Sequence, residues 1–164
     1  MITPITLFSF WHFFHTENIE YRKVVVPDKF SLSIPSYLSA SNQADSSALL
    51  QLFGSKENIF MLVYEIPIDS SNTLKFTFNN SAQEYISKMN SGSLLKYYPK
   101  KINNLNSYIG NIRGLVGKTN IYYRVAVIES RSTYYKIVLG ITNEEQSSYD
   151  ADFNIILESF TSIK

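Results

Sequence analysis

Three strand-like segments follow one another in the second half of the chain, and a helix-like segment comes directly after them. The three segments are residues 107–116, 121–129 and 134–141, and apolar side chains recur at every second position along them. This period of two is typical of strands, and the short turns between the segments join antiparallel neighbours. The order therefore predicts an antiparallel sheet.

The helix-like segment, residues 148–162, carries one apolar stripe. Its members stand at the spacings i, i+3, i+4 and i+7, namely Phe153, Ile156, Leu157 and Phe160. Burial of each such side chain stabilises a fold by about 1.5–3 kcal/mol before entropy losses. We therefore expect this helix to lie on the sheet, which makes the fold class α+β.

The first half of the chain adds further strand patterns. The expected strands are residues 21–26, 30–34, 48–53 and 58–66. The last of these is apolar on both alternating faces, which is typical of a strand covered on both sides. The polar residues 39–47 are expected to form a loop.

A second helix is expected over residues 76–90. Asn80 or Ser81 is expected to cap its start, and Glu84 stands three residues after Ser81, as in a capping box. Its buried stripe is expected to be Tyr85, Ile86 and Met89. The less regular residues 93–106 are expected to connect this helix to the sheet.

Length and composition favour one domain of ordinary globular character. The 164 residues suit a single core, and the net charge of +1 argues against a nucleic-acid-binding protein. The absence of cysteine excludes a disulfide framework and a thiol nucleophile. We expect residues 21–164 to form the domain. Residues 1–20 are expected to be an N-terminal segment: an atypical or remnant signal, a first element of the fold, or a partner-binding tail.

The sequence offers no set of residues typical of catalysis, a metal site or a bound cofactor. His12 and His15 lie among aromatic residues without the further ligands that a metal ion needs. There is no Gly-x-Ser-x-Gly motif, and Gly117 is followed by a strand pattern rather than by the helix of a phosphate-binding loop. The acidic residues at 144–145 and 150–152 are expected to favour the dipole of the last helix.

Aromatic and basic residues instead point to a protein-binding surface. Tyrosine and arginine are enriched at such interfaces. The candidate residues are Tyr97, Tyr98, Lys100, Lys101, Arg113 and Arg124.

The ordered segments resemble the PsbP-like group over residues 21–162. The similar segments are the strand Phe-Ser-Leu-Ser-Ile-Pro at 30–35, the strand 109–116, the paired strands 122–127 and 134–138, and the closing helix 153–160, which ends in Glu-Ser-Phe. This group includes the extrinsic protein of photosystem II, a Ran-binding import factor and bacterial DcrB-like periplasmic proteins. The resemblance implies an antiparallel sheet sandwiched between helices.

The resemblance also implies a non-enzymatic binding or accessory protein. Its partner is expected to be another protein, in an envelope or secretion-related complex, and no membrane span is expected. The resemblance favours export to the periplasm, while a cytoplasmic location stays open. One alternative is a chaperone for hydrophobic segments of a secreted effector. The other is a small-ligand binder or enzyme whose site is lined by Tyr123, Arg124, Arg113 and Arg131.

Overall fold

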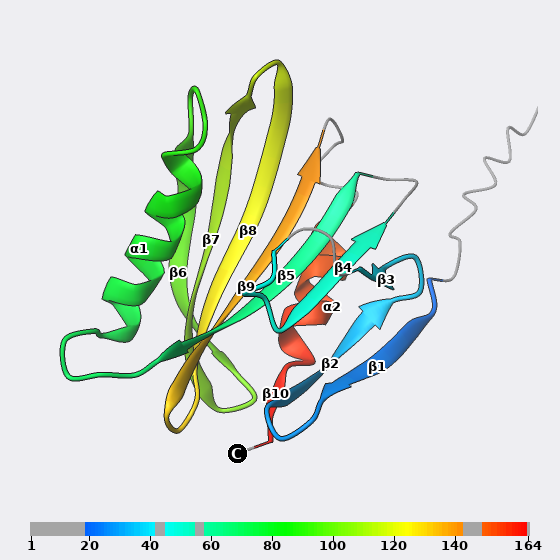
Figure 1. Cartoon of the computed structure of the whole chain (residues 1–164), viewed down its shortest axis with the longest axis vertical. Helices are drawn as coiled ribbons and strands as arrows, with labels where there is room; N and C mark the ends of the chain where they lie inside the picture. The colour runs from blue at the N-terminus through cyan, green and yellow to red at the C-terminus, as the bar shows by residue number, and fades with distance from the viewer. Residues whose placement is uncertain (1–18, 42–44, 55–57, 143–148, 164) are drawn as a thin grey trace, which may run out of the picture.

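A computed structural model describes residues 19–41, 45–54, 58–142 and 149–163, which form two β-sheets and two helices (Figure 1). The strands are β1 (Tyr21–Val26), β2 (Phe30–Pro35), β3 (Ser39–Ala40), β4 (Leu50–Gly54), β5 (Ile59–Pro67), β6 (Ser93–Ile102), β7 (Leu105–Val116), β8 (Thr119–Glu129), β9 (Thr133–Thr142) and β10 (Thr161–Ser162). The helices are α1 (Leu74–Ile86) and α2 (Asp150–Glu158).

Both sheets are antiparallel throughout. The large sheet has the order β3-β4-β5-β9-β8-β7-β6, and the small sheet has the order β1-β2-β10. The three consecutive strands predicted from the sequence are β7, β8 and β9, which pair with one another along nearly their full length. The predicted antiparallel α+β fold is confirmed.

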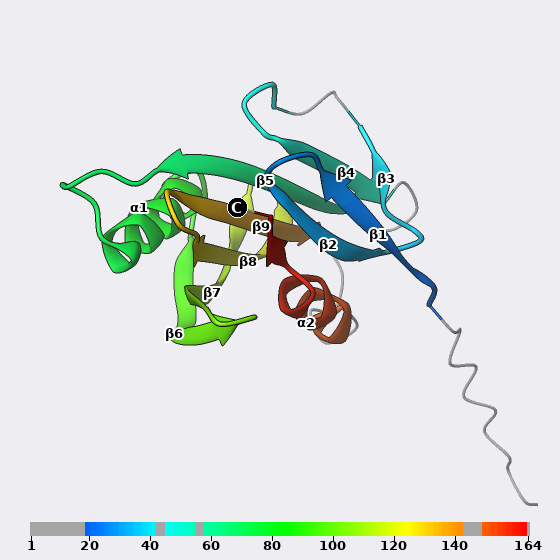
Figure 2. The ribbon, with the colours of Figure 1, turned by 90° about the horizontal axis from the view of Figure 1, so that it is seen from below.

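The helices lie on opposite faces of the large sheet (Figure 2). Helix α1 packs on β6, β7 and β8 and buries Phe78, Ala82 and Tyr85 against that face. Helix α2 and the small sheet cover the other face, where Phe30 and Phe153 belong to the larger apolar cluster. The large sheet is therefore the middle layer of a sandwich.

The apolar stripe predicted for the last helix is buried as expected. Phe153, Ile156 and Leu157 are at most 2% exposed, and so is Phe160, which follows the end of α2. The ring of Phe160 lies 5.5 Å from that of Phe30 and 5.4 Å from that of Tyr135, measured between centroids. This side chain joins the small sheet to the large one.

Two glycines of the large sheet have aromatic rings where a side chain would otherwise stand. A Cβ atom on Gly110 would lie 2.6 Å from the ring of Phe78, and one on Gly140 would lie 2.2 Å from the ring of Phe60. Glycine inside a strand often marks such close packing. At Gly110 it allows α1 to approach the sheet.

The expectation of an irregular connector over residues 93–106 is wrong. Residues Ser93–Ile102 form β6, an edge strand of the large sheet, and β7 begins at Leu105. Most of the side chains of β6 are exposed or only half-buried, on either face. The strand therefore lacks the apolar alternation by which strands are recognised in a sequence.

The expected cap of α1 is also wrong. The helix begins earlier, and Thr73 accepts a hydrogen bond from the backbone N–H of Phe76 at 3.2 Å. Ser81 lies inside the helix, where its hydroxyl donates to the carbonyl oxygen of Thr77. Glu84 also lies inside the helix and forms ion pairs with Lys88 and Lys136. Ser39–Ala40, expected to be loop, forms the short strand β3.

Candidate binding surface

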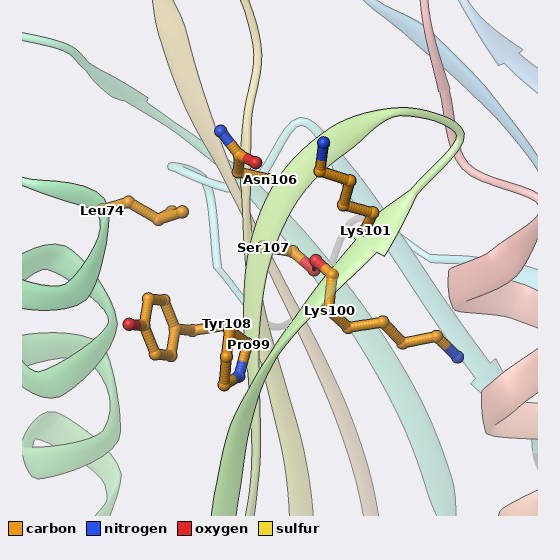
Figure 3. Close-up of a pocket in the computed structure, with 7 residues that line it drawn as sticks. All are labelled: Leu74, Pro99, Lys100, Lys101, Asn106, Ser107 and Tyr108. Atoms are coloured by element: carbon orange, nitrogen blue, oxygen red, sulfur yellow. Dashed lines mark hydrogen bonds between the residues drawn. The ribbon is translucent and has the colours of Figure 1, made fainter.

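An open pocket lies where the start of α1 faces the hairpin of β6 and β7 (Figure 3). Its volume is about 390 Å³. The residues that line it, hereafter the β6–β7 pocket, are Leu74, Pro99, Lys100, Lys101, Asn106, Ser107 and Tyr108. The pocket thus includes two of the residues predicted to bind a partner.

The hairpin that carries the pocket is fixed by hydrogen bonds at its turn and between its two strands. Its two-residue turn, Asn103 and Asn104, has φ angles of 46° and 68°, which asparagine adopts more readily than most residues. The side chain of Asn103 donates a hydrogen bond to the carbonyl oxygen of Phe160 at 2.7 Å. Across the hairpin, the hydroxyl of Ser107 donates to the carbonyl oxygen of Lys100 at 2.6 Å.

The pocket has an apolar side and a polar side. Leu74, Pro99 and Tyr108 lie on the side near α1, whereas Lys101 and Asn106 project together on the other (Figure 3). Asn106 donates to Glu129 at 3.1 Å, while the ammonium group of Lys101 forms no ion pair with any residue that the structure describes. Such a site suits a ligand group that combines an apolar body with a negative charge.

The structure distributes the other candidate residues of β6 over two faces of the sheet. Tyr97 is 45% exposed and stacks on Phe78 of α1, with ring centroids 5.8 Å apart. Tyr98 is half-buried against the α2 side of the sheet, where the ammonium group of Lys96 lies 5.6 Å from its ring. Lys100 also points to the α2 side and forms an ion pair with Glu158 at 2.6 Å.

Arg124 is buried beneath α2 and so is not part of an exposed surface. Only 6% of this residue is exposed, and its guanidinium group donates hydrogen bonds to Asn111 at 3.1 Å and to Asn154 at 2.8 Å. It also pairs with Asp150 at 2.8 Å and lies 5.8 Å from the ring centroid of Phe153. These contacts attach α2 to the sheet.

The alternative site of tyrosine and arginine residues is not assembled. Tyr123 packs on the α1 side of the sheet, whereas Arg124 lies on the α2 side. Arg113 is exposed near the far end of β7, and Arg131 is exposed in the turn between β8 and β9. These four side chains therefore do not face one common site.

Asp152 has a contact that the sequence did not predict. This carboxylate is 5% exposed and accepts hydrogen bonds from the hydroxyls of Tyr21 and Tyr37, the latter at 2.6 Å. Burial, together with the bond to Asp152, raises the pKa of both tyrosines above their usual value. The acidic first turn of α2 therefore ties β1 and the segment after β2 to the helix, in addition to any effect on the helix dipole.

A third buried charged residue, Lys136, lies beneath α1. Lys136 is 7% exposed, pairs with Glu84 at 3.0 Å and lies 4.2 Å from the ring centroid of Tyr64. Burial alone would raise the pKa of Glu84, but hydrogen bonds from Lys136 and Lys88 hold it below the usual value. Burial and a bond to Asp45 raise the pKa of Tyr64 to about 12. The sequence does not reveal that Lys136 is buried and paired with Glu84, because a lysine in an alternating strand is usually expected to face solvent.

Neither a metal cluster nor a membrane-spanning helix is found in the described part of the chain. No three of its aspartate and glutamate residues converge as metal ligands would. Neither α1 nor α2 is long and apolar enough to cross a membrane. His12, His15 and the acidic residues at 144–145 lie outside the described residues.

Comparison of the structure with solved structures identifies the fold. Cyanobacterial PsbP from Synechocystis superposes with a TM-score of 0.68 and 13% identity, over 90% of this chain and 95% of that one. The Ran-binding protein Mog1p of Saccharomyces cerevisiae gives a TM-score of 0.66 and 9% identity, over 89% and 97% of the two chains. The chain has the PsbP/Mog1/DcrB-like fold.

A third structure with this fold is LpqN of Mycobacterium tuberculosis, described as involved in cell envelope biogenesis. It is similar with a TM-score of 0.57 and 12% identity, over 88% of this chain and 91% of that one. The sequence itself matches no protein-family model and no curated protein. The PsbP-like resemblance predicted from the sequence is therefore confirmed at the level of the fold.

Proposed function

We propose that the chain is a non-enzymatic accessory protein that binds another protein through the β6–β7 pocket and the adjoining strand β6. The observation that carries this proposal is the pocket itself, which is lined on one side by the apolar residues Leu74, Pro99 and Tyr108 and on the other by Lys101. Farther along β6, Leu95 and Tyr97 are 51% and 45% exposed. Exposed aromatic side chains such as Tyr97 are enriched at protein interfaces.

The ligand group that fits the pocket is an acidic segment with an apolar side chain beside its carboxylate. A carboxylate near Lys101 would gain a charge-assisted hydrogen bond, which is stronger than a neutral one. The apolar part would cover Leu74 and Tyr108, and burial of apolar area contributes about 25 cal/mol per Å². Together these contacts give both affinity and orientation.

The similar structures favour a binding role over catalysis. Mog1p is described as Ran-binding and LpqN as involved in envelope biogenesis. We extend the second of these roles to this chain and propose a partner in an envelope or secretion-related complex. Within the described residues, the buried side chains of Arg124 and Lys136 form ion pairs with Asp150 and Glu84, and the second pair also lines a small open pocket of about 220 Å³.

Charge reversal at Lys101 tests this proposal. Wild-type chain and the Lys101→Glu variant would be immobilised and exposed to an extract of the native host, and the retained proteins would be quantified by mass spectrometry. We expect at least one protein to be retained about tenfold less by the variant, which corresponds to about 1.4 kcal/mol. The matched control is Lys118→Glu in the exposed turn between β7 and β8, which should retain the same proteins as wild type.

Two outcomes would contradict the proposal. The first is equal retention of every protein by wild type and by Lys101→Glu. The second is turnover of a small molecule by the purified chain.

The chaperone role remains a second candidate because of one aromatic row. Phe53, Phe60 and Tyr123 are half-buried, and their ring centroids follow one another at 6.1 and 5.8 Å. They lie on the α1 side of the large sheet, where α1 itself packs mainly on β6, β7 and β8. Binding of an isolated apolar helix to wild type but not to a Phe60→Asp variant would favour this role over the pocket.

A further inference from the structure

The two sheets have four edges among the described residues, and three of them are poor templates for another strand. Strands β3 and β10 have two residues each, which is too short to pair with an added segment. Strand β6 is longer, but its pairing with β7 is shifted at Leu95, and Pro99 in its middle has no N–H to donate. Bulges and prolines of this kind protect natural edge strands.

The outer edge of β1 has none of these protections. All six residues of β1 pair with β2 in an unbroken register from Tyr21 to Val26. No described strand pairs with the other side of β1. The strand contains no proline, and three consecutive valines follow Lys23.

The register shows which backbone groups face outward. The N–H of Ser36 donates to the carbonyl oxygen of Glu20 at 2.8 Å, and hydrogen-bonded pairs alternate along an antiparallel ladder. Residues 22, 24 and 26 are therefore bonded to β2, while the N–H and C=O groups of Tyr21, Lys23 and Val25 point away from it. The N–H of Ser33, opposite Lys23, likewise points away from β1 and reaches the hydroxyl of Ser159.

The side chains along this edge favour an acidic occupant. Arg22 and Lys23 are both exposed, and the side chain of Lys23 has no partner among the described residues. Val25 on the same face as Lys23 is 53% exposed. A second copy of β1 would bring four cations to one small sheet. An extended segment with an acidic residue opposite Lys23 and an apolar residue two positions away, on the same face, would pair with Lys23 and cover Val25.

We propose that the outer edge of β1 binds an extended, acidic segment of a partner protein, which adds a fourth strand to the small sheet. The main-chain hydrogen bonds supply affinity in this mode, and the alternate side chains supply selectivity. This surface lies on a different sheet from the β6–β7 pocket, so the two proposals hold or fail separately.

The test uses the full chain and a library of random ten-residue peptides displayed on phage. We expect selection to enrich peptides in which an acidic residue and an apolar residue stand two positions apart. Hydrogen exchange measured by NMR should then show the amides of Tyr21, Lys23 and Val25 at least tenfold slower with a selected peptide than without it. The Lys101→Glu variant should bind the same peptide unchanged.

Two substitutions at one position separate the backbone from the charge. Lys23→Pro removes the outward N–H, and proline is tolerated on an edge strand at such a position. Lys23→Ala keeps that N–H and removes only the ammonium group. We expect Lys23→Ala to weaken binding several-fold and Lys23→Pro to weaken it at least tenfold more than Lys23→Ala.

Three results would overturn the proposal. The first is the absence of any enriched peptide, and the second is equal binding to Lys23→Pro and Lys23→Ala. The third is a dimer of the chain, detected by light scattering, that Lys23→Pro abolishes, because a second copy would then be the occupant. If Lys23→Pro does not fold, the wild-type chain supplies the test. Slower exchange of the Tyr21, Lys23 and Val25 amides with the peptide supports the proposal, and unchanged exchange contradicts it.

Discussion

Arg124 joins three polar side chains at the junction between the large sheet and α2. Its planar group bonds to Asn111, Asn154 and Asp150 at once, which a lysine ammonium group cannot do with the same geometry. We expect Arg124→Lys to lower the free energy of unfolding by about 1–3 kcal/mol, because the ammonium group, at this buried position, can keep only part of these hydrogen bonds. Urea denaturation would measure this.

The matched control for Arg124→Lys is Arg131→Lys. Arg131 lies in the exposed turn between β8 and β9, where most substitutions change stability by less than about 0.5 kcal/mol. Equal stability of the two variants would show that α2 does not depend on the guanidinium group of Arg124.

The half-buried tyrosines Tyr21 and Tyr37 predict loss of stability in alkali. Tyr21 and Tyr37 have raised pKa values in the folded chain, chiefly through burial and then through the bonds to Asp152. Their stabilising contribution is fully present below the unfolded pKa of about 10 and is lost as the pH rises above it. We expect the free energy of unfolding to be constant from about pH 7 to 9 and to fall steadily above about pH 10.

Tyr37→Phe should flatten that decline, since phenylalanine has no proton to lose. The control is Phe76→Leu, an exposed position on α1 without an ionisable group, which should leave the slope against pH unchanged. Urea denaturation at a series of pH values would measure both slopes. Identical slopes in all three proteins would contradict the role of burial at Tyr37.

The helix α2 provides a prediction at the scale of one element. Phe153 is fully buried between the helix and the sheet, whereas Ile155 on the opposite side of the helix is 42% exposed. We expect Phe153→Ala to cost about 3–5 kcal/mol, as for other buried aromatic residues. Ile155→Ala should change stability by less than about 0.5 kcal/mol. Similar midpoints of thermal unfolding for the two variants would mean that α2 does not seal the core.

Strands whose apolar side chains alternate towards a core could be predicted from the sequence, whereas β6, which lacks this alternation, could not. The strands β7, β8 and β9 place Tyr123, Val125 and Ile137 at every second position towards a core, so their alternation is visible. Strand β6 is held by its hairpin with β7, and its Lys96, Tyr97 and Lys101 are exposed. Strand β6 forms because it pairs with β7, and the spacing of apolar residues in the sequence does not reveal such pairing.

The candidate site shows the same division. Lys100 and Lys101 were found from local composition, and they do line the β6–β7 pocket. The apolar wall comes from Leu74, which is far away in the sequence and reaches the pocket only through the packing of α1. The charge of Arg124 suggests an exposed binding residue, but α2, which follows β9 in the sequence, packs over it and buries it. Long-range packing of this kind leaves no local signal.

The whole molecule is best described as one sheet shared by two apolar clusters. The clusters on the α1 and α2 sides are separated only by the large sheet, and residues such as Leu62 and Met61 alternate between them along β5. Because the same strands contribute side chains to both clusters, loss of packing in one cluster disturbs strands that also support the other. We therefore propose that residues 21–164 form a single cooperative domain.

Removal of residues 1–20 tests this proposal. Every buried residue of the two clusters lies after residue 29, and β1 begins at Tyr21, where the side chain already bonds to Asp152. We expect a chain of residues 21–164 to unfold in one transition, at the same urea concentration as the full chain. The single tryptophan, Trp11, is absent from the shortened chain, so near-ultraviolet circular dichroism of the tyrosines would follow unfolding. A second unfolding transition in either protein would show that the domain is not cooperative. A loss of more than about 1 kcal/mol in the free energy of unfolding on shortening would show that the domain does not begin at β1, since surface changes seldom exceed about 0.5 kcal/mol.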